Sequence, residues 1–183
     1  MPRLTVVDPA QAEGEAKRLL DRVDRALGAT PNMMRAMAES PAVLDAYLSF
    51  SGALAKGHLS AATGEQLALL TASENACGYC AAAHTVLGER AGVSAEDLRA
   101  GLTGDASDPK TAAALRFARA VIQTKGFVSD DDLAAARAAG ITDGEIGEIV
   151  GHVALNVFTN YFNSVGETDI DFPPVALPTP QPA

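Results

Sequence analysis

Apolar side chains recur at helical spacing along most of the chain. Leu19, Leu20, Val23 and Leu27 lie on one stripe of a helix, and the segment 109–126 shows a similar three- and four-residue spacing. No stretch alternates apolar and polar residues convincingly with the period of two that a half-buried strand requires. The pattern predicts an all-α protein, a helical bundle of about eight to nine helices.

Capping residues, prolines and glycines predict where these helices begin and end. A Ser, Thr or Asp, in several places followed by Pro, comes before most periodic stretches, and Gly follows most of them. These signals predict helices over residues 8–28, 31–39, 40–57, 60–73, 77–92, 94–101, 108–126, 129–140 and 142–166.

The end of the chain has a different composition. From Thr168 it reads TDIDFPPVALPTPQPA, where closely spaced prolines exclude a helix and favour an extended conformation. We therefore expect one helical domain over residues 1–167 and an extended Pro-rich tail over residues 168–183. Phe172 and Val175 are the side chains that would anchor this tail on the body or on a neighbouring subunit.

Composition and charge limit the classes of partner. With 183 residues, of which 48% are apolar, the chain can build one well-buried core. A formal net charge of -9 and scattered Lys and Arg residues argue against binding to nucleic acid or to anionic lipid. The longest stretch without charged residues, 149–166, contains His152 and several Asn, so it is too polar for a membrane span.

The first residues, MPRLTVVDPAQAEGE, lack the basic end and the long apolar stretch of a secretory signal. We therefore expect the protein to stay in the cytoplasm. Thiols are reduced at rest in that compartment, which argues against a purely structural disulfide between the two cysteines.

Both cysteines lie in one short stretch, ENACGYCAAAH, over residues 74–84. On a helix, residues three and four apart share a face, so Cys77, Cys80 and His84 form one row. The imidazole can take or stabilise the proton of the Cys80 thiol, while Cys77 lies near the positive end of the helix dipole. Two thiols one turn apart can also close a disulfide with a local adjustment.

The two effects on thiol acidity compete. The helix dipole favours a thiolate at Cys77 by about 0.3 to 1 kcal/mol, and a charge-assisted contact with a partly buried imidazolium can exceed this amount. We therefore expect Cys80, the cysteine nearer to His84, to be the more reactive thiol.

A carboxylate is predicted to face this row. If the helices on either side of Asn75 form an antiparallel hairpin, position 65 lies opposite positions 84 to 86, and position 65 is Glu65. Glu65 would then orient His84 or pass a proton among Cys80, His84 and solvent. The alternative is that Glu65 is a solvated helix residue.

Two other interpretations of the cysteines remain open on the residues alone. Buried cysteines can pack without taking part in chemistry. A zinc site built from Cys77, Cys80, His84 and Glu65 is chemically reasonable, although the chain has no second CxxC motif and no His pair. We interpret His58 as an exposed loop residue and His152 as a core or interface histidine. The polar side chains of the last helix are expected to pair with each other or with backbone where helices meet: Asn156, Asn160, Tyr161 and Asn163.

The combination of Glu65, the Cys77-x-x-Cys80 motif and His84 resembles the active-site signature of the AhpD-like (alkylhydroperoxidase D-like) branch of the carboxymuconolactone decarboxylase superfamily. The resemblance covers most of the chain in helix order and is tight over residues 65–92. The segment LNVFTNYFNSVGETDIDFP also resembles the C-terminal end of the longer, peroxidase-related members. Alkylhydroperoxidase D tends to have a histidine between the two cysteines, where this chain has Gly78 and Tyr79.

The resemblance implies a thiol-dependent peroxidase with a CxxC dithiol/disulfide cycle. Cys80 would be the peroxidatic thiol, Cys77 the resolving thiol, and His84 and Glu65 the proton relay. The substrate would be a small hydroperoxide, and the reductant an external dithiol such as a lipoyl protein or a thioredoxin-like protein. No metal, flavin or heme is required for this chemistry.

The sequence also bears on the oligomeric state of the protein. The apolar, Asn-rich segment 149–166 and the tail with Phe172 suggest more apolar surface than one small domain can hide, so we expect a homo-oligomer. The family resemblance points to trimers or hexamers. The rival functions are a carboxylactone decarboxylase-like enzyme, which would not need the cysteines, and a non-catalytic redox-responsive helical oligomer.

Overall fold

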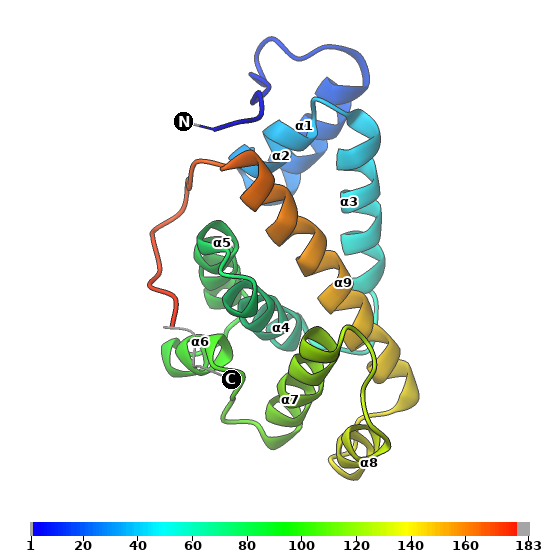
Figure 1. The fold of residues 1–183 in the computed structure, drawn as a ribbon. Coiled ribbons are helices and arrows are strands. Elements are labelled where there is room, and N and C mark those ends of the chain that lie inside the picture. The colour runs from blue at the N-terminus through cyan, green and yellow to red at the C-terminus, as the bar shows by residue number, and fades with distance from the viewer. Residues whose placement is uncertain (1, 179–183) are drawn as a thin grey trace.

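The computed structural model describes residues 2–178, and within this range the chain forms nine helices and no strand (Figure 1). The predicted all-α class is therefore confirmed. In chain order the helices are α1 (Gly14–Leu27), α2 (Asn32–Met37), α3 (Pro41–Leu54), α4 (Ala61–Glu74), α5 (Gly78–Arg90), α6 (Ala95–Leu102), α7 (Pro109–Thr124), α8 (Asp130–Ala138) and α9 (Asp143–Gly166).

The predicted caps account for most of these boundaries. Ser60, Asp108, Ser129 and Thr142 each accept a hydrogen bond from a backbone N–H in the first turn of the helix that follows. The helix predicted to begin at Asp8 starts six residues later, at Gly14. Asp8 instead closes a turn, in which its Oδ1 accepts from the N–H of Ala10 at 3.0 Å.

α4 lies at the centre of the fold. Its sequence, AATGEQLALLTASE, is apolar around most of its circumference, and Leu67, Leu69 and Leu70 are fully buried. Leu69 packs in a cluster with side chains of α1, α2, α3 and α5. Leu67 and Leu70 pack in a second cluster with α7, α8 and α9. α4 therefore belongs to both halves of the core, and the residues that it carries are held rigidly.

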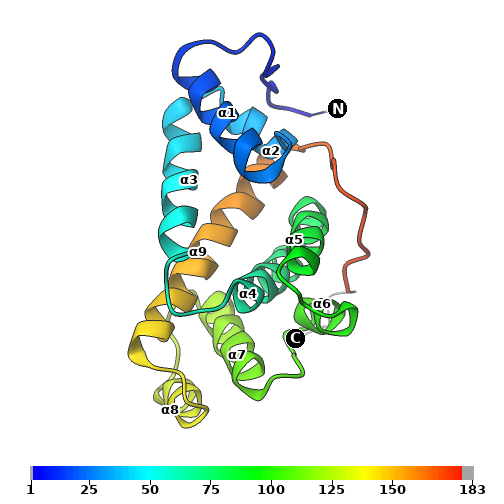
Figure 2. The ribbon, with the colours of Figure 1, turned by 180° about the vertical axis from the view of Figure 1, so that it is seen from behind.

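α9 crosses the molecule between α3 on one side and the α4–α5 hairpin on the other (Figures 1 and 2). It begins with a capping box in which Thr142 and Glu145 satisfy each other's backbone N–H groups. Its inner face is buried and includes Asn156, Asn160 and Asn163. The long helix thereby brings polar side chains from residues 156–163 against the start of α5.

The chain after α9 runs along the outer side of α5 toward α6 (Figures 1 and 2). Residues 168–178 form neither helix nor strand, and residues 179–183 of the predicted tail lie outside the described range. Phe172 and Val175 pack against the core, and Asp171 accepts a hydrogen bond from the N–H of Asn32 at 2.8 Å. The division of the chain at residue 167 into a domain and a tail stays a prediction.

The outer face of α9 exposes large apolar side chains, among them Phe158, Tyr161 and Val165. An exposed apolar stripe of this kind is typical of a subunit contact, and the expected homo-oligomer stays a prediction. Within residues 2–178, no helix combines the length and the apolar character that crossing a membrane demands.

Candidate functional site

The α4–α5 hairpin places the cysteine pair at the start of a helix. α4 ends at Glu74 with Asn75 as its C-cap, and Ala76 takes the left-handed conformation with φ of 53°. The N–H of Cys77 then donates to the carbonyl of Ala72 at 2.8 Å, which satisfies the end of α4. Cys77 is the N-cap of α5, and its Sγ accepts from the N–H of Cys80 at 3.3 Å. The tight turn fixes both thiols, which are free and buried.

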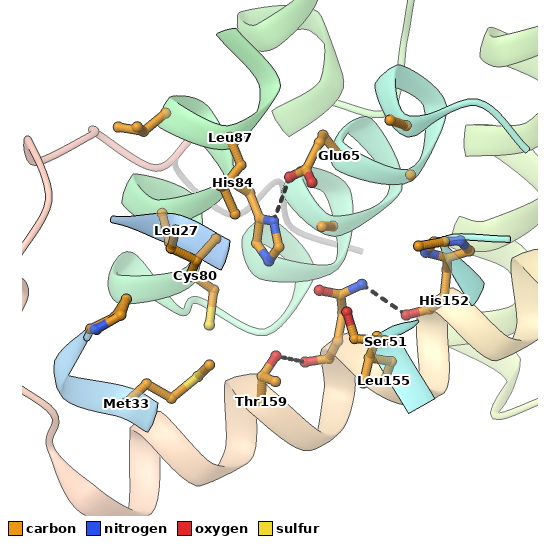
Figure 3. A pocket seen from close by; sticks show the side chains of 18 of the residues that line it. Leu27, Met33, Ser51, Glu65, Cys80, His84, Leu87, His152, Leu155 and Thr159 are labelled. Atoms are coloured by element: carbon orange, nitrogen blue, oxygen red, sulfur yellow. Dashed lines mark hydrogen bonds and ion pairs between the residues drawn. The ribbon is translucent and has the colours of Figure 1, made fainter. Parts of the chain in front are cut away.

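Glu65 and His84 face each other across the hairpin. Oε2 of Glu65 lies 2.7 Å from Nδ1 of His84, as the symmetry of the hairpin predicted (Figure 3). Burial disfavours the imidazolium, but the charge and the hydrogen bond of Glu65 outweigh it, so the pKa of His84 is raised. With Nδ1 held by the carboxylate, Nε2 is the nitrogen left to exchange a proton with another group.

The two thiols have opposite acidities. A hydrogen bond from Cys77 and the charge of His84 outweigh burial, and together with contacts from α9 they lower the pKa of Cys80 to about 6. The pKa of Cys77 is raised, first by its hydrogen bond to Cys80 and then by burial. Cys77 therefore stays a thiol at neutral pH and donates to a thiolate at Cys80. This difference supports Cys80 as the nucleophile, the role expected from its distance to His84.

Two asparagines of α9 also reach Cys80, and sequence reasoning missed them. Nδ2 of Asn163 donates to Sγ of Cys80 at 3.3 Å. Asn160 is fully buried beside the same sulfur and contributes to lowering the pKa of Cys80. The sequence shows Asn residues at helical spacing in an apolar helix, and this pattern indicates that they share a face. The pattern does not reveal which other helix that face contacts.

A cavity of about 260 Å³ opens on Cys80. Cys80, His84 and Glu65 line one wall, and Leu155 and Thr159 of α9 line the opposite wall (Figure 3). Most of the remaining lining is apolar and comes from α1, α2, α3, α5 and the tail: Leu27, Met33, Met34, Leu54, Leu87 and Phe172. Cys77 does not line the cavity. A ligand in this space therefore meets the acidic thiol and not its partner.

Tyr47 and His152 also line the cavity. Burial raises the pKa of Tyr47 to about 12, so it presents a phenol O–H at neutral pH. Burial also lowers the pKa of His152, which keeps that imidazole neutral. Gly64 allows the ring to approach α4, because a Cβ at Gly64 would lie 3.1 Å from Cε1 of His152. His58 is exposed, as predicted, and its Nδ1 lies 2.7 Å from Oε1 of Glu148.

Tyr79, which lies between the two cysteines, holds neighbouring segments in place. Its hydroxyl accepts from the N–H of Met33 at 3.2 Å, and its ring packs edge-on against Phe172 with centroids 5.7 Å apart. Burial raises the pKa of the phenol, so Tyr79 does not act as a base near neutral pH. The residue links α5 to α2 and to the tail.

The zinc alternative finds no support in the geometry. Over residues 2–178, no three His, Cys, Asp or Glu side chains are grouped so that they could hold a metal ion. The four residues of the motif are arranged instead as two neighbouring pairs, Cys77 with Cys80 and Glu65 with His84.

Comparisons with known proteins agree with this fold. Residues 41–123 match the model of the Carboxymuconolactone decarboxylase family. These residues include the whole α4–α5 hairpin with Glu65, both cysteines and His84. No curated protein matches the chain significantly.

Several solved structures are similar to the chain over nearly its whole length. One is described as an alkylhydroperoxidase AhpD core, an uncharacterized peroxidase-related protein from Ralstonia eutropha JMP134; it has a TM-score of 0.84 and 22% identity, covering 93% of this chain and 92% of that chain. An uncharacterized peroxidase-related protein from Silicibacter sp. TM1040 has a TM-score of 0.78 and 22% identity, covering 94% and 92%.

A third similar structure is a cysteine-to-alanine variant of the debrominase Bmp8 in complex with 2,3,4-tribromopyrrole. It has a TM-score of 0.78 and 19% identity, covering 92% of this chain and 91% of that chain. At these identities the three likenesses establish the shared fold.

Proposed function

Because the chain is an AhpD-like member of the carboxymuconolactone decarboxylase superfamily, we propose that it reduces hydroperoxides with the thiols of Cys80 and Cys77. The observation that carries the proposal is a single buried thiol of lowered pKa, Cys80, which opens on an apolar cavity beside the Glu65–His84 pair. A low pKa makes the thiolate available at neutral pH, and the thiolate is the form that attacks oxidants.

In the first step the Cys80 thiolate attacks the terminal oxygen of a hydroperoxide, ROOH. The S–O bond forms as the O–O bond breaks, and the alkoxide leaves. His84, kept protonated by Glu65, gives this oxygen a proton, so that the products are ROH and a sulfenic acid on Cys80. The raised pKa of His84 supports this role, since a general acid must hold its proton until the leaving group takes it.

In the second step Cys77 attacks the sulfur of the sulfenic acid. The S–S bond forms as the S–O bond breaks, and hydroxide leaves as water with the proton of the Cys77 thiol. The Sγ of Cys77 already accepts from the backbone N–H of Cys80 at 3.3 Å, so the two residues need a local adjustment only. An external dithiol then reduces the disulfide and restores both thiols.

The lining of the cavity favours an organic hydroperoxide over hydrogen peroxide. Met33, Leu27 and Leu155 offer apolar contact to an alkyl or aryl group, while the peroxide oxygens meet Cys80 and His84. The reductant is a dithiol that reaches the Cys80 side of the disulfide through the same cavity, such as a lipoyl group carried on a partner protein. A thioredoxin-like protein is the alternative reductant.

Stopped-flow mixing of the reduced protein with cumene hydroperoxide and with hydrogen peroxide tests the proposal. We expect the loss of two thiols per chain for each peroxide consumed, with the organic peroxide reacting faster. A protein that keeps both thiols in excess peroxide is not a peroxidase, and the non-catalytic oligomer then becomes the better interpretation.

A second candidate function, reductive debromination of a small aromatic ring, is favoured by the apolar cavity at a thiolate. The Cys80 thiolate would attack bromine, the ring carbanion would take a proton from His84, and Cys77 would displace bromide to form the disulfide. A ring of the size of 2,3,4-tribromopyrrole is the appropriate probe, because the similar debrominase was solved with that molecule. Release of bromide by the reduced protein would support this function.

Replacing both cysteines distinguishes a thiol peroxidase from the carboxylactone decarboxylase alternative. A variant with Cys77→Ser and Cys80→Ser loses both thiol functions, whereas a decarboxylase that does not need the thiols keeps its turnover of a carboxylated lactone.

A further inference from the structure

The side-chain amide nitrogen of Asn163 donates only to sulfur. Nδ2 lies 3.3 Å from Sγ of Cys80 and 3.1 Å from Sδ of Met33, and both are weak acceptors when uncharged. Oδ1 of Asn163 has no hydrogen-bond partner among the described residues, although the side chain is buried. A buried amide that is satisfied so poorly destabilises a protein unless it serves another purpose.

Asn160, one turn earlier on α9, is a second buried amide with an atom that is unpartnered within residues 2–178, in this case the nitrogen. Its Oδ1 accepts from Nδ2 of Asn75 at 3.0 Å, and Asn75 gives its other N–H to the carbonyl of Thr71. These two bonds fix the amide so that Nδ2 of Asn160 points away from Asn75. That nitrogen has no partner of good geometry within the described structure, and the residue is fully buried.

We propose that Asn160 and Asn163 form a two-donor site on α9 that binds the Cys80 sulfur as a thiolate. The two residues are three positions apart and so present their amides from the same face of α9 to the start of α5. A negatively charged sulfur turns the weak contact of Asn163 into a charge-assisted hydrogen bond, and it gives Nδ2 of Asn160 the acceptor that this nitrogen lacks in front of an uncharged thiol. The inference takes from the proposed function only that Cys80 is the attacking thiol.

The effect of the two asparagines on Cys80 can be distinguished from the effects of the titratable groups around the sulfur. Cys77, the N-cap of α5, donates to Cys80, and His84 of α5 acts through its charge, with Glu65 of α4 behind it. Tyr47 of α3 and Tyr79 of α5 also interact with Cys80, but as phenols of raised pKa they carry no charge at neutral pH. The amides of α9 add donors that do not titrate, so their effect on Cys80 persists at every pH at which the fold is intact.

The proposal predicts that removing the amide of Asn163 lowers the reactivity of Cys80 without lowering the stability of the protein. Asn163→Leu keeps the volume of the side chain and removes both the donor to Cys80 and the unpartnered Oδ1. We expect the midpoint of the alkylation rate of Cys80 against pH to rise by about one pH unit, the size of one charge-assisted hydrogen bond. The midpoint of urea unfolding should stay the same or rise, since no well-made hydrogen bond is lost.

Asn156→Leu is the matched control. Asn156 is a buried residue of the same helix, but its Nδ2 donates to the carbonyl of His152 at 2.8 Å and not to sulfur. We expect this variant to leave the alkylation midpoint of Cys80 where it is. The measurement uses iodoacetamide on reduced protein, with Cys77→Ser as the common background, so it does not depend on peroxidase activity. Equal midpoints for Asn163→Leu and the parent would overturn the proposal even if the protein reduces peroxides.

A second measurement requires no change to α9. In protein labelled with ¹⁵N asparagine, the side-chain N–H resonances of Asn160 and Asn163 should shift downfield as Cys80 titrates, with the same midpoint as the alkylation rate. The resonances of Asn156 should not follow that midpoint. Side-chain amides of Asn160 and Asn163 that stay constant while Cys80 titrates would show that they do not bind the thiolate.

Discussion

Nδ1 of His84 lies 2.7 Å from Oε2 of Glu65, although the two residues are 19 positions apart and belong to different helices. The carboxylate raises the pKa of the imidazole against the effect of burial. The pair therefore holds a proton next to Cys80, where a leaving alkoxide would need it.

Glu65→Gln should remove this support and leave the fold in place. We expect the pKa of His84 to fall, because burial is then no longer opposed by a carboxylate. Peroxide reduction at neutral pH should slow by about 10- to 100-fold for lack of the proton donor. Stopped-flow kinetics measure the rate, and Glu89→Gln, an exposed change on the same helix as His84, is the control that should react like the parent. Equal slowing by both changes would contradict the relay.

The reactivity of Cys80 should follow its pKa of about 6. The thiolate predominates above that pH, so the alkylation rate should rise from pH 5 to about pH 7 and then level off. His84→Ala removes a positive charge that favours the thiolate, and the midpoint should move upward. Iodoacetamide labelling followed by mass spectrometry gives the rate for each cysteine. If the alkylation rate of Cys80 in the parent has its midpoint near the ordinary thiol pKa of about 8.5, then Cys80 is not an activated thiol.

The hairpin geometry of the site could be predicted from sequence because it is local. Glu65 and His84 lie at nearly equal distances along the chain from Asn75, and helical spacing alone aligns Cys77, Cys80 and His84. Contacts from α9 could not be predicted in this way. Asn163 meets Cys80 across 83 positions, and only the packing of α9 against α5 decides which Asn residues face the sulfur.

The first helix shows the other limit of sequence reasoning. Asp8 followed by Pro9 is a common start for a helix, and it is also a common start for a turn. The choice depends on tertiary contacts, since the N–H of Val7 donates to the carbonyl of Arg35 and holds this segment beside α2. The stripe of Leu19, Leu20 and Val23 was predicted correctly because these side chains fill the core.

The two cysteines should be distinguishable by trapping. In Cys77→Ser, one equivalent of hydroperoxide should leave a sulfenic acid on Cys80 that dimedone labels, because no thiol remains to resolve it. Cys80→Ser should hardly react, since the pKa of Cys77 is raised and its sulfur does not line the cavity. Mass spectrometry of the adducts locates the label. An adduct on Cys77 in Cys80→Ser, together with an inert Cys77→Ser, would reverse the assigned roles.

Glu148 of α9 anchors the chain just before α4 and so helps to position Glu65. Its carboxylate accepts from the N–H groups of His58 and Leu59 at 2.8 and 2.9 Å, and its side chain is 15% exposed. Burial raises its pKa, but these hydrogen bonds outweigh burial and lower the pKa to about 2. The folded value is below the unfolded value of about 4.3, so this stabilisation is complete well above pH 4 and is lost as pH falls toward 2.

Glu148→Gln should therefore destabilise the protein at neutral pH by about 1 to 3 kcal/mol, the cost of weakening hydrogen bonds to a partly buried carboxylate. The difference from the parent should shrink as pH falls from about 4 toward 2, because the unfolded carboxyl of the parent then takes up a proton while the folded carboxyl stays ionised. Urea unfolding at pH 7 and at pH 3 measures both differences, with the exposed change Glu39→Gln as the control. A deficit that is the same at both pH values would mean that the side chain acts through its shape and not through its charge, and the electrostatic anchor of α4 would then have to lie elsewhere.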